Sequence, residues 1–487
     1  MPIRLDNETR FELVKALVES FADADALAAA VLIRTGTDLT QQMDLGGGRS
    51  AAVTKVVAYT EGQEWLDKVI EAALIAAPGN QPLQRIADRL GVRPPPPRDM
   101  GDNSGAATPR RDGDFLIRLL QSVDGFTILA RNRAGQLKEA TVDAVPDRLL
   151  RNLPHIQAIL LQGAVGTRGI VRALNRASDR ATLREMGEDV FRFLMPGDVK
   201  ELFDESRSAA GGRGEKLRVQ IDVASAPALA HIPWELAYDK AFGDHLCLAE
   251  PTPMCRSVKA VANFARSTRP LRILGMVSKP HLPGLHEDKD TVNFGREQTA
   301  ITEALNKLGE ERVTLHWTTS GTRSELRRMF RSPPSGESWG VFHFIGHGEF
   351  DSELSEGYLL LQEAGGIARL SGQNLRHLAV NAGKTPQLVV LNCCSGARAA
   401  PGLSFSSVAE KLVQGGIPAV IAMQFEVSER AAQIFSSCFY AQIAIGETVQ
   451  TALTIARQEL CSDDIAEWVT PALYMSGPDF ALVDRAP

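Results

Sequence analysis

Short apolar runs separated by helical patterns constrain the fold of residues 113–487 more strongly than any other feature of the sequence. The runs lack the alternation of apolar and polar residues that marks a half-exposed strand, which indicates strands buried on both faces. We therefore predict an α/β fold with a mostly parallel sheet and helices on both of its faces. The predicted strands are residues 127–130, 158–162, 217–223, 271–277, 313–318, 341–345, 358–362, 388–391 and 419–423.

Two of these runs lead into residues that carry chemistry. Residues 339–351 (WGVFHFIGHGEFD) and 387–397 (QLVVLNCCSGA) each read as a buried strand that ends in a glycine-containing turn. The first turn presents His347 between two glycines, and the second presents Cys394. Functional groups gather at the carboxyl ends of parallel strands, so we expect this imidazole and this thiol to meet. An imidazole beside a thiol activates the thiol for acyl transfer, which predicts a cysteine protease.

Composition narrows the class of protein. A chain of 487 residues has room for roughly three domains, and its 44% hydrophobic and 23% charged residues are typical of soluble globular proteins. The net charge of -6 argues against general nucleic-acid binding, which needs a basic face. The first residues have no apolar run of the signal-peptide kind, so we expect no signal peptide, and no apolar run is long enough to cross a membrane. We expect a cytoplasmic protein with no nucleic-acid or membrane partner, whose six cysteines are free thiols.

Residues 1–92 differ from the rest in pattern and composition. Apolar residues recur at helical spacing, as in Phe11, Val14 and Leu17, and the segment contains no histidine and no cysteine. We predict a helical bundle with an acidic surface and no catalytic residues, which makes it an interaction module. Residues 93–112 (RPPPPRDMGDNSGAATPRRD) are predicted to be a linker, stiff at its prolines and flexible beyond them.

Residues 6–90 resemble a known family, the type-one effector-associated domain, which is a death-fold-like adaptor of bacterial conflict systems. The resemblance rests on the runs ALVESFADADALAAAVLIRTGTDL and WLDKVIEAALIAAPGNQPLQRIA and on the helix at 53–61 between them. It implies docking to a partner protein that carries a matching domain, in the setting of bacterial immunity. The alternative is a helical domain that only packs against its own C-terminal half.

Residues 231–239 (HIPWELAYD) place a proline and a tryptophan in one short segment. We expect a packing corner in which Trp234 is buried and Glu235 is paired or caps a helix. On this interpretation the segment contributes no chemistry of its own.

A second resemblance covers about residues 200–487. The HIPWELAYD segment, the GHG around His347 and the downstream LNCCSG resemble the CHAT family of caspase and separase relatives. This resemblance implies a caspase-like fold. In such a fold residues 113–265 form a non-catalytic half and residues 266–487 form the catalytic half.

The family pattern also assigns the reactive cysteine. Cys393 and Cys394 are adjacent, so on a strand they point to opposite faces and only one can face the cleft. Alignment on the pattern puts Cys394 at the nucleophile and Cys393 at a small buried position, although a register shift of one residue would exchange them. His347 precedes Cys394 by 47 positions, close to the spacing of about 50 residues in caspases.

The resemblance implies a caspase-like endopeptidase that cleaves a target protein with a cysteine–histidine dyad. His347 is the base that takes the thiol proton or, as imidazolium, the acid that protonates the leaving amine. The backbone N–H groups of Cys394 and Gly348 would bind the oxyanion. We expect no metal and no cofactor, since zinc binding by His343, His347 and two adjacent cysteines would have poor geometry. The functional alternative is an inert scaffold with the protease fold.

Substrate selection is predicted from the residues that flank the pair. Carboxylates follow His347 closely, and the segment after the strand at 419–423 is expected to form one wall of the cleft. We expect the substrate to lie extended along this wall by strand addition, and the carboxylates to favour a basic or neutral side chain before the cut. The alternative is that the carboxylates are solvated loop residues. The predicted substrate-binding residues are Glu349, Asp351, Gln424, Phe425 and Glu426.

Overall fold

The computed structural model of the chain divides into two compact units, Met1–Thr108 and Pro109–Pro487. The residues that it describes are 5–20, 49–62, 66–76, 80–92, 113–122, 125–162, 171–260, 269–281, 294–334, 336–351, 353–354, 356–363, 366–380, 385–395, 403–425, 427–463 and 465–484. The predicted linker, residues 93–112, lies outside the described residues.

The first unit is helical in each of its described elements, as predicted. These elements are α1 (Asn7–Ser20), α3 (Arg49–Gly62), α4 (Leu66–Ala76) and α5 (Gln81–Leu90). Leu17 of α1 and Val57 of α3 are fully buried in its core. At the start of α5 the Asn80 side chain accepts a hydrogen bond from the backbone N–H of Leu83, and at its end Gly91 has φ 71°. Both are caps that the sequence encodes locally, since asparagine suits the first position and glycine the left-handed one.

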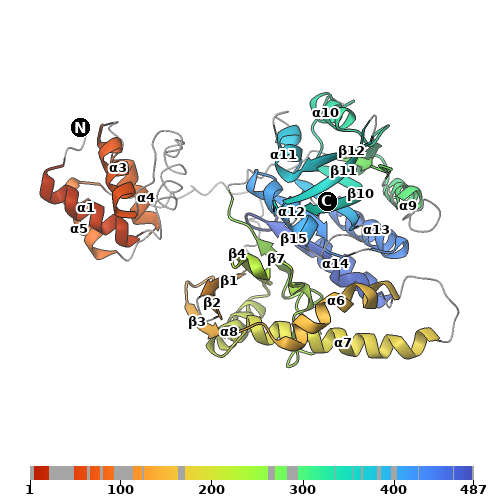
Figure 1. Cartoon of the computed structure of the whole chain (residues 1–487), viewed down its shortest axis with the longest axis horizontal. Helices are drawn as coiled ribbons and strands as arrows, with labels where there is room; N and C mark the ends of the chain where they lie inside the picture. The colour runs from red at the N-terminus through yellow and green to blue at the C-terminus, as the bar shows by residue number, and fades with distance from the viewer. Residues whose placement is uncertain are drawn as a thin grey trace. The chain divides into compact units, whose positions relative to one another are not determined.

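The second unit alternates strands with helices (Figure 1). Its helices are α6 (Asp147–Gln162), α7 (Val171–Leu194), α8 (Asp198–Gly212), α9 (Phe294–Asn306), α10 (Arg323–Arg331), α11 (Gly372–Val380), α12 (Leu403–Gln414), α13 (Glu429–Ile445) and α14 (Val449–Ser462). The strands of its large sheet are β1 (Gly113–Ser122), β2 (Gly125–Asn132), β3 (Leu137–Val142), β4 (Leu217–Ser225), β7 (Met254–Ser257), β8 (Leu271–Val277), β9 (Val313–Trp317), β10 (Val341–Asp351), β11 (Glu356–Glu363), β12 (Gly366–Ser371), β13 (Leu388–Ser395), β14 (Ala419–Met423) and β15 (Pro471–Met475). Between β4 and β7 lie the short elements η2 (Pro227–Leu229), η3 (Trp234–Leu236), β5 (Tyr238–Asp239) and β6 (Asp244–His245), and η4 (Ala466–Val469) precedes β15.

The 13-stranded sheet has the order β12-β11-β10-β13-β14-β15-β7-β4-β1-β2-β3, with β8 paired to β10 and β9 paired to β8. Strands β8, β9, β10, β13 and β14 are parallel to their neighbours in this group, while β11, β12 and β15 add antiparallel pairs. The C-terminal strand β15 pairs with β7, which pairs with β4. One sheet therefore runs through both predicted halves, residues 113–265 and 266–487.

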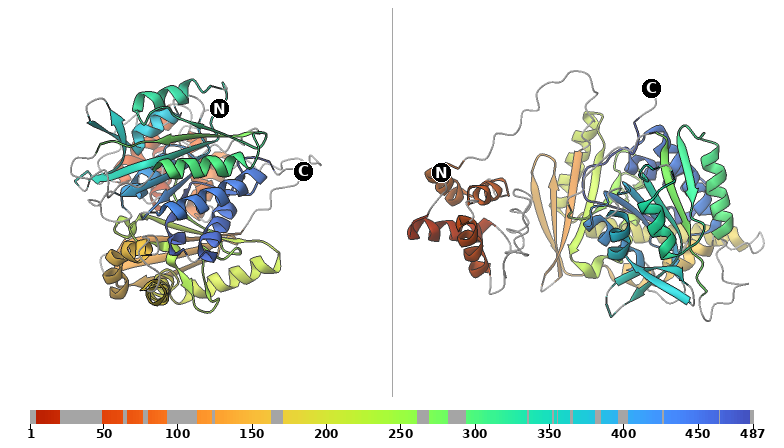
Figure 2. Two further views of the ribbon diagram at one scale, coloured as in Figure 1. Left: turned by 90° about the vertical axis from the view of Figure 1, so that its right-hand side faces the viewer. Right: turned by 90° about the horizontal axis from the view of Figure 1, so that it is seen from above.

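Helices cover both faces of the part of the sheet that contains β10 and β13. Helices α10, α11 and α12 pack on the face that carries Phe342, Phe344 and Leu391. On the opposite face, which carries Val341 and Ile345, lie α9 and α13, and α14 packs against α13. The left-hand view of Figure 2 shows strands between these helix layers. The predicted α/β architecture, with a mostly parallel sheet covered on both faces, is confirmed.

One predicted strand is wrong, because residues 158–162 form the end of α6. Their apolar side chains continue a helical spacing in which Leu149, Ile156 and Leu160 are buried, and a short apolar run does not distinguish a buried strand from a helix. The sequence prediction also omitted β1, β3, β7, β12 and β15. Figure 1 shows α8 beside β2 and β3, and α6 next to α7.

Candidate active site

His347 lies inside a strand that changes its neighbour. Residues 341–345 of β10 pair in parallel with β8, whereas His347 to Asp351 pair antiparallel with β11. On its other side β10 stays paired with β13 as far as Gly348. The predicted turn at His347 is therefore wrong. Strand β8 ends at Val277 and β11 takes its place along β10, so backbone hydrogen bonding continues without a turn.

Gly346 is required for packing and not for a turn. A Cβ atom at this position would lie 2.7 Å from the ring of Phe344 and 3.0 Å from the carbonyl oxygen of Ser278. The backbone N–H of Ser278 donates a 2.9 Å hydrogen bond to the carbonyl oxygen of Ile345, which brings the end of β8 close to β10. A larger residue at 346 would force these groups apart one residue before His347.

The strand that carries the cysteines extends further than predicted. Strand β13 continues to Ser395, and its parallel register with β10 pairs His347 with Cys394 and Gly346 with Cys393. Neighbouring strands are about 5 Å apart and paired positions share a face of the sheet. Position 394 is therefore next to His347 and on its face. The side chains of both cysteines, and residues 396–402, lie outside what the structure describes.

Three of the other cysteines are poor nucleophiles. Cys247 and Cys255 are buried, and burial raises the pKa of each thiol to about 12. Burial also raises the pKa of Cys438 to about 11. A thiol that remains protonated at neutral pH reacts slowly, because the thiolate is the nucleophile. Cys461 is exposed in the last turn of α14.

A second histidine on the same strand is buried and neutral. His343 is 1% exposed, and its Nδ1 lies 2.6 Å from the hydroxyl oxygen of Tyr440 on α13. Burial lowers the pKa of His343 to about 3, so the imidazole is uncharged at neutral pH. Burial and the charge of Glu297 raise the pKa of Tyr440 well above its ordinary value, so the phenol keeps its proton.

Glu297 and Asn392 form a buried polar pair beside these groups. The side-chain amide of Asn392 on β13 donates a hydrogen bond to the carboxylate of Glu297 on α9, and both residues are 4% exposed. Glu297 lies in the first turn of its helix, where the helix dipole favours a negative charge. No local pattern reveals this contact, because 95 residues separate the two partners.

The carboxylates that follow His347 lie on a strand and face a cation. Arg369 of β12 donates hydrogen bonds of 2.9 and 2.6 Å to the carboxylate oxygens of Glu349, and its guanidinium lies 3.9 Å from the carboxylate of Asp351. The hydrogen bond to Glu349 raises the pKa of Arg369. The predicted acidic surface beyond His347 is thus a mixed-charge surface, and these two residues are not on a loop.

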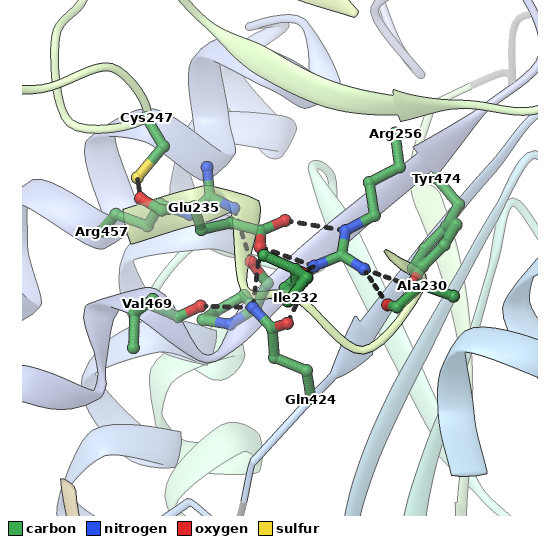
Figure 3. Close-up of polar contacts among 10 residues, drawn as sticks. Ala230, Ile232, Glu235, Cys247, Arg256, Gln424, Arg457, Val469 and Tyr474 are labelled. Atoms are coloured by element: carbon green, nitrogen blue, oxygen red, sulfur yellow. Dashed lines mark hydrogen bonds and ion pairs between the residues drawn. The ribbon is translucent and has the colours of Figure 1, made fainter. Parts of the chain in front are cut away.

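Gln424 belongs to a buried network (Figure 3). Its Oε1 accepts a 2.8 Å hydrogen bond from Arg256, and its Nε2 donates one of 2.8 Å to Glu235 and one of 2.9 Å to a backbone carbonyl oxygen. Gln424 is 4% exposed and Phe425 is 5% exposed. Neither side chain lines an exposed wall of the kind predicted, because both are packed inside the protein. Glu426 lies outside the described residues.

Strand β14, which precedes this segment, has no room for an added strand within the described part of the sheet. It pairs in parallel with β13 on one side and antiparallel with β15 on the other. A substrate strand therefore cannot add to β14 itself, because β15, which lies far along the sequence, occupies that edge. Strand addition along the segment after β14 stays a prediction.

The ion pair between Glu235 and Arg256 is the centre of the Gln424 network. The two side chains are 2% and 4% exposed, and their closest nitrogen–oxygen distance is 2.7 Å. Burial is the largest single effect and opposes ionisation of Glu235. The charge and hydrogen bonds of Arg256, the charge of Arg457 and the hydrogen bond from Gln424 together outweigh it and lower the pKa of the carboxyl group. Trp234 is fully buried. The packing corner predicted for residues 231–239 is confirmed.

Among the residues that the structure describes, no three or more His, Cys, Asp or Glu side chains cluster as ligands of a metal ion. None of the described helices has the length and apolar character needed to span a membrane.

Two family models match the chain. The model described as CHAT domain matches residues 184–478, and the model described as effector-associated domain 1 matches residues 3–91. No curated protein matches the chain.

Solved structures also align with the chain. The separase of a Saccharomyces cerevisiae separase–securin complex aligns with a TM-score of 0.43 and 10% identity, over 96% of this chain and 37% of that chain. The Drosophila initiator caspase Dronc aligns with a TM-score of 0.27 and 11% identity, over 46% of this chain and 93% of that chain. The chain thus spans little more than a third of the separase chain that it matches.

Proposed function

The chain belongs to the CHAT family and carries an effector-associated domain 1, and from this we propose that it is a caspase-like cysteine endopeptidase recruited to its site of action by a partner protein. The observation that carries the proposal is the β10–β13 register, which pairs His347 with position 394. The partner carries a matching effector-associated domain, and the output is cleavage of a target protein in a bacterial conflict system.

Cys394 is the proposed nucleophile. Its register partner is His347, whereas Cys393 is paired with Gly346, which has no side chain to act as a base. Burial keeps the thiols of Cys247 and Cys255 protonated, which argues against both as alternatives. The buried His343 is neutral and bound to Tyr440, so His347 is the imidazole left to serve Cys394.

The proposed reaction proceeds by acyl transfer. The thiolate of Cys394 attacks the carbonyl carbon of the scissile peptide bond, forming a carbon–sulfur bond and an oxyanion. As the intermediate collapses, the carbon–nitrogen bond breaks and protonated His347 gives its proton to the leaving amine. Water then attacks the thioester while His347 accepts a proton, which releases a carboxylic acid and restores the cysteine.

The oxyanion is proposed to bind the backbone N–H groups of Cys394 and Gly348. The β10–β13 register pairs Gly348 with the residue after Cys394, so both backbone segments run side by side at the reacting end of the strands. Loss of one donor in such sites reduces catalysis by about 100-fold or more.

Glu349 and Asp351 are proposed to contact the substrate, because they follow His347 on the same face of β10. Arg369 neutralises part of their charge. We therefore expect a weaker preference for basic side chains than the carboxylates alone would produce.

The test uses the purified full-length protein, its Cys394→Ala and Cys393→Ala variants, and a peptide library read by mass spectrometry in the presence of proteins encoded beside its gene. We expect cleavage by the wild type and by Cys393→Ala, and none by Cys394→Ala. Iodoacetamide labelling at mildly acidic pH gives a readout that needs no substrate, and it should modify Cys394 first. No cleavage by either wild type or Cys394→Ala would favour the inert scaffold, and equal cleavage by both would exclude Cys394 as the nucleophile. Loss of activity only in Cys393→Ala would exchange the roles of the two cysteines.

A further inference from the structure

We propose that Glu297 is a positioning residue for the Cys394–His347 pair and that it acts through Asn392. This inference deepens the proposed function and rests on it. The mechanism above uses neither residue, yet both are almost completely buried on the face of the sheet that carries His347.

Strand register places Asn392 directly beside the reacting positions. In the β10–β13 ladder Asn392 is paired with Ile345, and Cys394 is paired with His347. Positions two apart on a strand share a face and are separated by about 7 Å. Position 392 is therefore one strand repeat from position 394, and the side-chain amide of Asn392 donates a hydrogen bond to the carboxylate of Glu297.

One hydrogen bond joins this carboxylate to a second element. Helix α9 supplies Glu297 in its first turn, and β13 supplies the amide that donates to it. On the elements that pack around it, Tyr440 of α13 and His343 and His347 of β10 lie on this side of the sheet. The same elements and β9 carry the further titratable side chains Glu429, Arg430, Cys438, Glu349, Asp351 and His316. Burial and, to a lesser extent, the charge of Glu297 raise the pKa of Tyr440, so this neighbour of Glu297 stays neutral.

A fixed negative charge here has a defined chemical effect. It favours the imidazolium form of His347, which is the form that protonates the leaving amine. It also disfavours the thiolate of Cys394, so both ionisations move to higher pH together. Unit charges about 7 Å apart at a protein-like dielectric constant shift a pKa by on the order of one unit. The Asn392 bridge adds a geometric effect, since it ties the end of β13 to α9.

The test compares Glu297→Gln with the wild-type full-length chain. Glutamine keeps an oxygen that accepts from Asn392 and removes only the charge. The measurement is the rate of iodoacetamide labelling of Cys394 between pH 4 and 10, followed by mass spectrometry of the peptide that contains it. We expect the midpoints of this profile to fall by on the order of one pH unit. A purely structural role would change the amplitude and leave the midpoints in place.

Glu303→Gln is the matched control, because Glu303 is exposed on the same helix and its replacement removes the same charge. Glu297→Asp retains the charge and should keep the wild-type midpoints even if its rate is lower. In a double-mutant cycle, Glu297→Gln with Asn392→Ala should slow labelling no more than the larger single change, since both act on one contact.

The inference would be overturned if the pH midpoints of Cys394 labelling in Glu297→Gln equalled those of the wild type. It would also be overturned if Glu303→Gln shifted these midpoints as much as Glu297→Gln does. If Glu297→Gln fails to fold, Glu297→Asp decides, because midpoints that move although the charge remains would contradict the electrostatic role. Failure of the proposed function is recognised separately, by cleavage that is the same in wild type and Cys394→Ala.

Discussion

Two histidines on β10 have opposite chemical environments although only four residues separate them. His343 is buried against Tyr440 and stays neutral, while His347 lies where β10 changes its neighbour and is paired in register with Cys394. The sequence marked His347 by its two glycines. One of these, Gly346, makes room for the Phe344 ring. The glycine is therefore needed for packing, whereas the sequence pattern predicted a turn.

We expect His343 to make the protein sensitive to acid. Its pKa is about 3 in the folded protein against an ordinary value of 6.5, so only the unfolded chain binds the proton between these values. The stabilisation is present in full above pH 6.5 and is lost as the pH falls toward 3, by about 1.4 kcal/mol for each pH unit. His343→Asn should therefore show a smaller fall in melting temperature between pH 7 and pH 5 than the wild type.

The exposed His377 is the matched control for this measurement. His377→Asn removes an imidazole of the same kind from the surface of α11 and should leave the wild-type pH dependence unchanged. An unaltered acid slope in His343→Asn would contradict the buried neutral state of His343.

At the scale of elements, the central strands were predicted well and their partners were not. The runs at 271–277, 388–391 and 419–423 appear as β8, β13 and β14, with β13 four residues longer than expected. Buried strands have a local apolar signature, whereas β3 and β12 are short, partly exposed edge strands without one. The occupation of both edges of β14 depends on β15, which no local pattern connects to it.

The Glu235–Arg256 pair joins η3 and β7 to the segment after β14, and we expect its disruption to be costly. Arg256→Leu would leave the carboxylate of Glu235 buried without its cation, which should lower the free energy of unfolding by about 3 to 5 kcal/mol. Denaturant unfolding followed by tryptophan fluorescence measures the change, since Trp234 is adjacent to Glu235 and fully buried.

The double variant Glu235→Leu/Arg256→Leu separates the charge from the packing. It should recover much of the loss, because removing both charges leaves neither one uncompensated. For comparison, the surface pair Arg430–Asp463 is 67% and 42% exposed, so Arg430→Leu should have little effect. A small effect of Arg256→Leu alone would show that the buried pair is not tightly coupled.

At the scale of the whole molecule, the two units divide recognition from chemistry in the proposed function. Phe11 on α1 is 74% exposed in the first unit, an unusual position for a large apolar side chain. We expect Phe11→Ser to weaken binding to a partner with the same domain by at least tenfold and to leave the folding of the unit intact. Isothermal titration with the partner's purified domain measures the first effect, and circular dichroism measures the second.

Leu13→Ala is the contrasting variant on the same helix, since Leu13 is fully buried and its truncation should destabilise the unit by about 2 to 5 kcal/mol. Deletion of residues 1–92 removes the whole first domain and should cause the largest loss of target cleavage that depends on recruitment. If target cleavage in cells survives that deletion undiminished, the recruitment proposal is wrong.

Local pattern was enough to identify the helical first unit, the buried strands of the second and the segments that carry His347 and Cys394. These features depend on residue types within one element, so they can be read along the chain. Only the tertiary structure decided which strands are neighbours, including the replacement of β8 by β11 along β10. It also decided two side-chain contacts, that of Glu297 with Asn392 and that of Gln424 with Glu235. Those contacts join residues 95 and 189 positions apart, and the preference of each partner for the other has no expression in either local sequence.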